Sequence, residues 1–133
     1  MRAEDLLVTA IVAVNAVGDI DDGRWPEAIS AGEDIWPEPE ESENTNTVIG
    51  VVVTNAQLDK SGCLTVAQGA HDGLARAVFP PHMRSDGDAF VAASVGTFDA
   101  PIDQVRMLAV VAVELPPCRV WISSSSTRRP NCL

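Results

Sequence analysis

Basic residues are scarce in this chain of 133 residues, because nine Lys and Arg stand against 19 Asp and Glu and give a formal net charge of −10. Nucleic acids and anionic membrane surfaces are bound by clustered Lys and Arg, which displace counterions. Arg128-Arg129 is the only adjacent basic pair. The composition therefore argues against a nucleic-acid partner and against binding to a membrane surface.

Cysteines and histidines are also few. Cys63, Cys118 and Cys132 contain no CxxC spacing and cannot all pair with one another, so they indicate neither a disulfide framework nor a zinc site. His71 and His82 are the only histidines, and without matching cysteines they make a poor metal site. We expect no metal and no cofactor, and the cysteine usage favours a reducing, cytoplasmic location.

A long hydrophobic run is missing as well. The start, "MRAEDLLVTAIVAVNAVG", has Arg2, a short apolar run and small residues near Ala16, and could therefore imitate a secretion signal. Glu4 and Asp5 spoil the positive segment that such a signal needs, and the apolar run is far too short to span a bilayer. We expect no membrane partner, with a secretion signal as the alternative.

The remaining composition is that of one modest globular domain. Hydrophobic residues make up 46% of the chain and charged residues 21%, which suffices for a real core. The stretch "EDIWPEPEESE", residues 33–43, is read as an exposed loop, because Pro37 and Pro39 forbid a helix and like charges repel. The tail, residues 115–133, has no apolar face and is expected to be irregular.

Two apolar runs rich in β-branched residues predict strands. Leu6–Val14 and Val48–Thr54 are nearly all apolar, as strands buried on both faces would be. The first ends at Gly18 and an acidic turn, and Gly50 inside the second predicts close approach of another backbone. A third strand is expected over Ala89–Val95.

The hydrophobic period changes to that of a helix between Cys63 and Phe79, and Pro80-Pro81 stops it. A second helix opens at Pro101 and ends by Pro116. The apolar stripe of the first helix is expected to contain Leu64, Ala67, Ala70, Leu74 and Val78. With at least three strands and two helices, the fold class is α/β or α+β.

The stretch "ENTNTVIGVVVTN", residues 43–55, places hydroxyl and amide side chains at the mouth of the second strand. Such residues usually form a polar turn. Alternatively, one threonine is a nucleophile. A threonine is activated without a histidine when it begins a chain, because its own α-amine is the neighbouring base. The chain would then have to cut itself before that threonine, by an acyl shift to an ester that water hydrolyses.

Several segments of the chain occur in the order found in one known family. "VTAIVAVNAVGDI", "NTVIGVVVTNAQLDK", "AHDGLARAVFPPH" and "DGDAFVAASVG" resemble the C-terminal part of the L-aminopeptidase/D-esterase family, the self-processing N-terminal-nucleophile hydrolases that include the β-peptidyl aminopeptidases. The resemblance covers residues from about 5 to 114. It implies a layered α+β sandwich of the N-terminal-nucleophile type, incomplete relative to the family.

Carried over residue by residue, the resemblance implies self-cleavage between Asn46 and Thr47, with Thr47 as the nucleophile. Counting back from Gly50 places the nucleophile on Thr47 and not on Thr45. Asn15 corresponds to an asparagine whose amide stabilises the oxyanion, where a preorganised donor acts on developing charge.

Asp86 and Asp88 stand where the family has two polar or acidic residues around a glycine, which orient the new amine and assist proton transfer. Without the resemblance, Asp-Gly here would simply predict a turn before a strand. His82, in the loop before Asp86, is the candidate for contacting the substrate. His71 lies beside the apolar stripe of a helix, where a structural role is expected.

The resemblance implies a partial hydrolase domain over residues 1–114, in which residues 1–46 end the larger-subunit region and residues 47–114 begin the smaller-subunit region. The implied activity is that of an aminopeptidase releasing N-terminal residues from short peptides, amides or esters. The alternative is a catalytically silent fragment, because the family's chains are much longer. Two helices cannot cover a sheet on both faces. We therefore expect open apolar surface and a homo-oligomer or aggregates.

Overall fold

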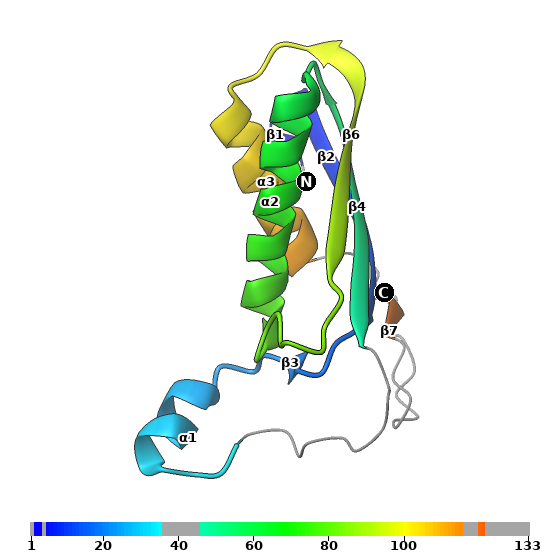
Figure 1. Ribbon diagram of the computed structural model, residues 1–133. Helices are drawn as coiled ribbons and strands as arrows, with labels where there is room; N and C mark the ends of the chain where they lie inside the picture. The colour runs from blue at the N-terminus through cyan, green and yellow to red at the C-terminus, as the bar shows by residue number, and fades with distance from the viewer. Residues whose placement is uncertain (1, 4, 36–45, 116–119, 122–133) are drawn as a thin grey trace.

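The computed structural model describes residues 2–3, 5–35, 46–115 and 120–121, in which two long helices lie on one face of a sheet (Figure 1). The helices are α1 (Trp25–Ala31), α2 (Lys60–Ala77) and α3 (Ile102–Glu114). The strands are β1 (Arg2–Ala3), β2 (Leu6–Asn15), β3 (Asp19–Ile20), β4 (Thr47–Ala56), β5 (Val78–Phe79), β6 (Ala89–Phe98) and β7 (Val120–Trp121). The predicted α/β class is confirmed.

Strand β4 lies at the centre of the sheet, whose order is β1-β2-β4-β6, with β7 also paired to β2. β2 and β4 run antiparallel, and their register extends from Val8 opposite Thr54 to Asn15 opposite Thr47. β4 and β6 run parallel and are joined through α2, since parallel neighbours need a crossover connection. β4 is thus paired along both edges.

The core lies between the sheet and the two helices. Alternate residues of β2 and β4 point into it, and small residues on α2 allow α3 to approach closely. A Cβ at Gly73 would lie 2.4 Å from the Val110 carbonyl oxygen, which is backbone and cannot easily give way. Side chains that are essentially fully buried here include Leu6, Val8, Val48, Val52, Val66, Ala70, Val105 and Ala109.

The first long helix begins earlier and ends sooner than the sequence pattern predicted. Asp59 caps it by accepting a hydrogen bond from the Gly62 amide at 2.7 Å, which satisfies a donor of the first turn. Val78 leaves the helix and is buried in β5, which pairs with β3. Leu64, expected in the apolar stripe, is 60% exposed, and Val66 takes the buried place in that part of the helix.

Helix α1 was not predicted. Pro26 stands in its first turn, where a missing amide proton costs nothing, and Gly32 ends it in the left-handed conformation at φ 72°. Figure 1 shows this short helix set apart from the sheet and the long helices. Most of the expected acidic loop and of the expected irregular tail lies outside the described residues, although Val120–Trp121 of that tail forms β7.

The prediction that β2 and β4 are buried on both faces is wrong. Burial alternates strictly along β2, because α2 and α3 cover only one face of the sheet. The opposite face is apolar, and no helix or strand among the described residues packs over it. We call it the open sheet face; its exposed large side chains are Leu7 (46%), Ile11 (72%), Ile49 (58%), Val91 (58%) and Val95 (70%).

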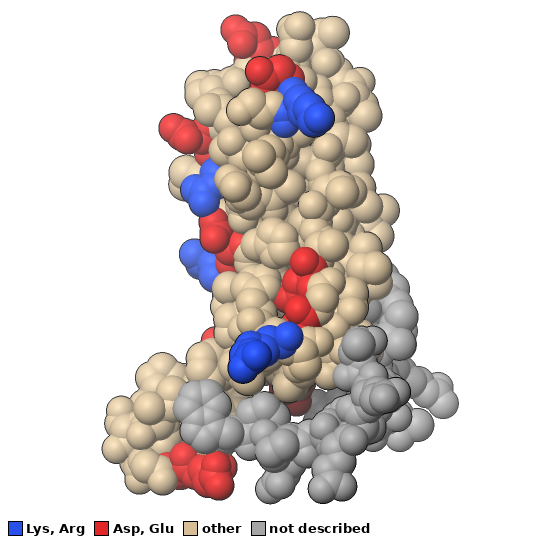
Figure 2. Space-filling view, viewed as in Figure 1, with Lys and Arg blue, Asp and Glu red and all other residues tan. Residues whose placement is uncertain are grey.

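Charge is distributed unevenly over the surface. In Figure 2, the flank formed by the sheet carries almost no coloured side chains above the grey region, whereas Asp, Glu, Lys and Arg gather over the helices. Two ion pairs bridge α2 and α3: Arg76 Nε lies 2.8 Å from Glu114 Oε2, and Arg106 pairs with Asp72. No helix in the described part of the chain combines the length and the apolarity needed to cross a bilayer.

We predict that the chain associates through the open sheet face, because large exposed apolar patches find partners. Ile11→Lys should reduce association and hydrophobic-dye binding. Ile29→Lys is the matched control, since Ile29 is also about half exposed, at 51%, but lies on α1. Light scattering and dye fluorescence measure the effect. A stable monomer that binds no dye would contradict the prediction, as would equal effects of the two substitutions.

Candidate active site

The junction between Asn46 and Thr47 lies where the chain enters β4. Thr47 is the first residue of β4 and stands directly opposite Asn15, the last residue of β2. Residues opposite each other in an antiparallel pair point to the same face of the sheet. Both residues continue the alternation of Ala13 and Ile49, which are exposed, so the candidate nucleophile and the candidate oxyanion donor lie at the end of the open sheet face.

The carbonyl oxygen of Asn46 has two hydrogen-bond donors. The Thr47 hydroxyl, Oγ1, donates to it at 2.6 Å. The Gly87 amide also donates to it, at 2.8 Å, and Asn46 pairs with Asp86 in an isolated parallel bridge. A Cβ at Gly87 would lie 3.2 Å from Thr47 Oγ1, a distance shorter than most such contacts. Gly87 therefore packs against the hydroxyl and the carbonyl together.

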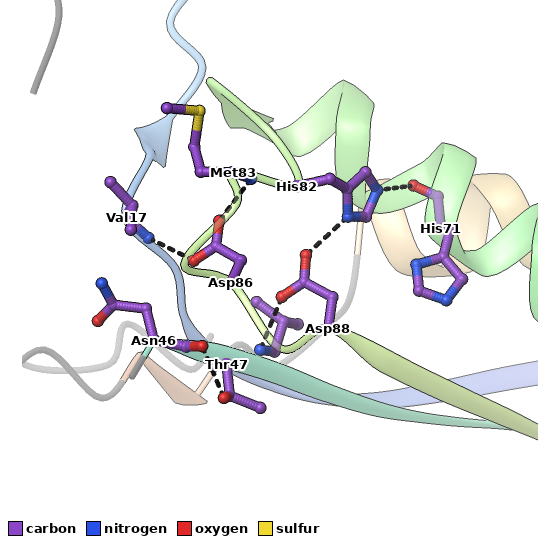
Figure 3. Close-up of polar contacts among 9 residues, drawn as sticks. Val17, Asn46, Thr47, His71, His82, Met83, Asp86 and Asp88 are labelled. Atoms are coloured by element: carbon purple, nitrogen blue, oxygen red, sulfur yellow. Dashed lines mark hydrogen bonds and ion pairs between the residues drawn. The ribbon is translucent and has the colours of Figure 1, made fainter. Parts of the chain in front are cut away.

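Asp88 binds the backbone just after the junction, at Val48. Its side chain is only 5% exposed. Oδ1 accepts a hydrogen bond from the Val48 amide at 2.9 Å, and Oδ2 lies 2.6 Å from His82 Nδ1. Figure 3 shows the Thr47 side chain pointing away from Asp88 and His82, on the other side of β4. Asp88 therefore binds the strand backbone beside Thr47 and does not contact the Thr47 hydroxyl.

Asp86 ties the end of β2 to the same loop. Its Oδ1 accepts from the Val17 amide at 3.1 Å, and its Oδ2 accepts from the Met83 amide at 3.0 Å (Figure 3). The loop forms a turn, since the Asp86 amide donates to the Met83 carbonyl at 2.8 Å. The turn thus lies over residues 83–86 and not at Asp86-Gly87, where it was expected, while both carboxylates lie near the junction as expected.

The two histidines meet on the helical side of the sheet. The rings of His71 and His82 have centroids 5.2 Å apart, and His82 Nε2 lies 3.3 Å from the His71 carbonyl oxygen. His71 also packs edge-on against Phe90 at 4.9 Å. The pKa of His71 is lowered from its usual value of 6.5, first by burial and then by the nearby His82, while Asp88 opposes the shift.

Gly50 serves a different purpose from the one predicted. The group that approaches it is not another backbone but the ring of Phe90, because a Cβ at Gly50 would lie 2.0 Å from Phe90 Cε1. The ring fills the space that a side chain would need, and His71 rests on it.

The structure brings most of the predicted site residues to one place. Asn15, Thr47, Asp86 and Asp88 all border the same junction, and His82 joins them through Asp88. Gly87 was not among the predicted site residues, because its contribution is a backbone amide that donates to the Asn46 carbonyl and leaves no signal in the sequence beyond "DGD". Among the described residues, no group of three or more His, Cys, Asp or Glu is placed to hold a metal ion.

Known proteins resemble the chain over most of its length. The family model of Peptidase family S58 matches residues 1–116. A protein of Mycobacterium leprae named as an uncharacterized aminopeptidase is 37% identical over 141 aligned residues, which cover 95% of this chain but 38% of the relative. Uncharacterized aminopeptidases of Mycobacterium tuberculosis and Mycobacterium bovis are each 34% identical over 88 residues, or 66% of this chain and 24% of theirs. The chain thus spans well under half the length of these relatives.

The lowered pKa of His71 predicts how stability changes with pH. A pKa that falls on folding means that the unfolded chain binds the proton more readily, so the stabilisation is present above about pH 6.5 and is lost as the pH falls below it. We expect the free energy of unfolding of the native chain to drop more between pH 7.5 and 5.5 than that of His71→Gln. Denaturant unfolding at both pH values measures this, and identical drops would contradict the prediction.

Proposed function

Because this chain belongs to peptidase family S58, we propose that it carries the catalytic residues of an aminopeptidase-type hydrolase that cuts itself between Asn46 and Thr47. The activated protein releases N-terminal residues from short peptides, amides or esters. One observation carries the proposal: the Asn46 carbonyl oxygen accepts from both the Thr47 hydroxyl at 2.6 Å and the Gly87 amide at 2.8 Å. The bond to be cut lies beside its nucleophile and a donor.

Self-cleavage begins when Thr47 Oγ1 attacks the carbonyl carbon of Asn46. Negative charge develops on the carbonyl oxygen, and the Gly87 amide is already aimed at it, which lowers the barrier. The carbon–nitrogen bond then breaks, the nitrogen takes up the proton lost by the hydroxyl, and an ester links Asn46 to Thr47. Water hydrolyses the ester, leaving a carboxylate on Asn46 and a free α-amine on Thr47.

The mature site combines groups on both faces of the sheet. The freed amine of Thr47 acts as the base for its own hydroxyl. Asn15, directly across from Thr47, donates its amide to the oxyanion of the substrate. Asp86 and Asp88 orient the new terminus, since Asp88 accepts from the amide of the next residue, Val48, and Asp86 fixes the loop that carries Gly87. The substrate contact expected of His82 belongs to the same proposal.

A catalytically silent chain remains the second candidate, and the open sheet face favours it. Thr47 and Asn15 border a surface that no described element covers, so few walls are available to hold a substrate. A displacement of about 1 Å can cost on the order of a hundredfold in rate. The relatives are much longer than this chain, which covers 38% of the Mycobacterium leprae protein.

The proposed surroundings of the enzyme follow from charge and exposure. With a net charge of −10, we propose no nucleic-acid and no membrane partner, and a small peptide or amide as substrate. We also propose a cytoplasmic location and a homo-oligomer that buries the open sheet face, with aggregation where no partner is available.

We predict that Thr47→Ala leaves one intact chain, because it removes the nucleophile of self-cleavage. Thr47→Ser is the matched control, which keeps a hydroxyl and should still yield fragments ending at Asn46 and beginning at residue 47. Intact-mass measurement distinguishes the two. Cleavage at the same bond in Thr47→Ala would reject the assignment.

We predict weak or no hydrolysis of N-terminal amino-acid p-nitroanilides and β-peptide amides by this chain alone. Catalytic residues that act together contribute little to the rate when their relative positions are not held. The assay compares the native chain with Thr47→Ala at equal concentration. Robust turnover that Thr47→Ala abolishes would overturn this expectation and make the chain a complete hydrolase.

A further inference from the structure

His82 occupies an unusual backbone conformation beside the site. Its φ is 50°, and it is the one non-glycine residue with positive φ in the described part of the chain. L side chains adopt this left-handed region at a cost, and such conformations persist where the surrounding structure determines them. Here the conformation places the imidazole between Asp88 and the His71 carbonyl group of α2 (Figure 3).

Both ring nitrogens of His82 face acceptors. Nδ1 lies 2.6 Å from the carboxylate oxygen Oδ2 of Asp88, and Nε2 lies 3.3 Å from the carbonyl oxygen of His71. An imidazolium donates at both nitrogens, whereas a neutral imidazole donates at one. Both ring nitrogens therefore lie against groups of the protein itself, while the side chain remains 36% exposed.

Asp88 needs the imidazole because its carboxylate is almost completely buried, with a side-chain exposure of 5%. A buried carboxylate is tolerated when charged or polar partners surround it. His82 satisfies one oxygen, and the Val48 amide satisfies the other. The contacts therefore run from α2 through His82 and Asp88 to the backbone just after Thr47.

Gly87, the residue before Asp88, binds the backbone on the other side of Thr47. The Gly87 amide binds the Asn46 carbonyl, so the loop holds the backbone on both sides of Thr47. Any shift of Asp88 would move Gly87 with it, because the two are adjacent in the chain.

We propose that His82 is a positioning residue: by holding Asp88, it fixes the Val48 amide and the Gly87 amide, and thereby the Asn46–Thr47 bond. Its effect on self-cleavage rests on the proposed function. Its effect on the geometry of the junction does not, and can be measured separately.

The experiment replaces His82 with residues that tolerate a left-handed backbone. His82→Asn places an amide nitrogen where Nδ1 stands and keeps the donor to Asp88. His82→Asp has the same shape but sets a second carboxylate against Asp88. His82→Gly removes the side chain without backbone strain, in case His82→Asp fails to fold. Arg84→Gln, at an exposed position in the same loop, is the control.

Two readouts are taken on the full chain. Hydrogen exchange of the Val48 and Gly87 amides is measured in the Thr47→Ala background, where the junction is intact. The rate of cleavage between Asn46 and Thr47 is measured by mass in chains that keep Thr47.

We expect exchange at Val48 and Gly87 to be about tenfold faster or more in His82→Asp and His82→Gly. Each of these two variants loses the hydrogen bond between the side chain at position 82 and the Asp88 carboxylate. Cleavage should slow by a similar factor. His82→Asn and Arg84→Gln should stay within about threefold of the parent chain in both readouts. Rescue by Asn separates positioning through Asp88 from a merely structural role of the ring.

Parent-like exchange at Val48 in His82→Gly would overturn the proposal, as would a His82→Asn chain as impaired as His82→Gly. If the parent chain is never cleaved, self-cleavage is wrong, and the exchange pattern alone decides whether His82 positions the junction.

Discussion

The pairing of β4 on both of its edges is the constraint on which the candidate site depends. Antiparallel pairing to β2 sets Thr47 opposite Asn15, and parallel pairing to β6 brings the loop before β6 to the same end of β4. Because the side-chain period of a strand is two, a slip of one residue would turn Thr47 toward the helices. The alternation of buried valines along β4 and β2 opposes such a slip, since Val48 and Val52 would lose their places in the core.

The same alternation divides the site between two environments. Thr47 and Asn15 lie on the open sheet face, whereas Asp88, His82 and His71 lie on the side covered by α2. The Phe90 ring fills the space left by Gly50 and packs against His71 from the sheet. The groups that hold the backbone therefore lie on the helix-covered side of the sheet, while the groups proposed to react with substrate lie on the side that no described element covers. The proposed self-cleavage uses only the first environment and the Thr47 hydroxyl, whereas the proposed turnover of substrate needs walls over the second.

The sequence predicted the elements well where periodicity was strong. The long strands, the two long helices and the convergence of Thr47, Asn15, Asp86 and Asp88 follow from apolar patterns and from the family resemblance. The prediction that β2 and β4 are buried on both faces was wrong. An apolar run indicates that both faces of a strand are hydrophobic, but it does not indicate whether other elements cover them. The segments that cover a face can come from outside the chain.

The backbone contacts of the site could not be predicted from the sequence. The Gly87 amide and the left-handed conformation of His82 depend on how the loop is folded against β4, and "PHMRSDGDA" carries no pattern for either. Gly50 was predicted to allow a close approach, but only the register of β4 against β6 identifies the approaching group as Phe90. Such details arise from tertiary packing rather than from local preference.

We propose above all that the loop before β6 holds the Asn46–Thr47 bond in place for attack. A crystal structure of the Thr47→Ala chain, in which this bond remains intact, tests it most directly. We expect the Gly87 amide to lie on the Asn46 carbonyl oxygen, and Asp88 to lie between the Val48 amide and His82. An Asn46 carbonyl turned away from Gly87, with Asp88 released from Val48, would contradict it.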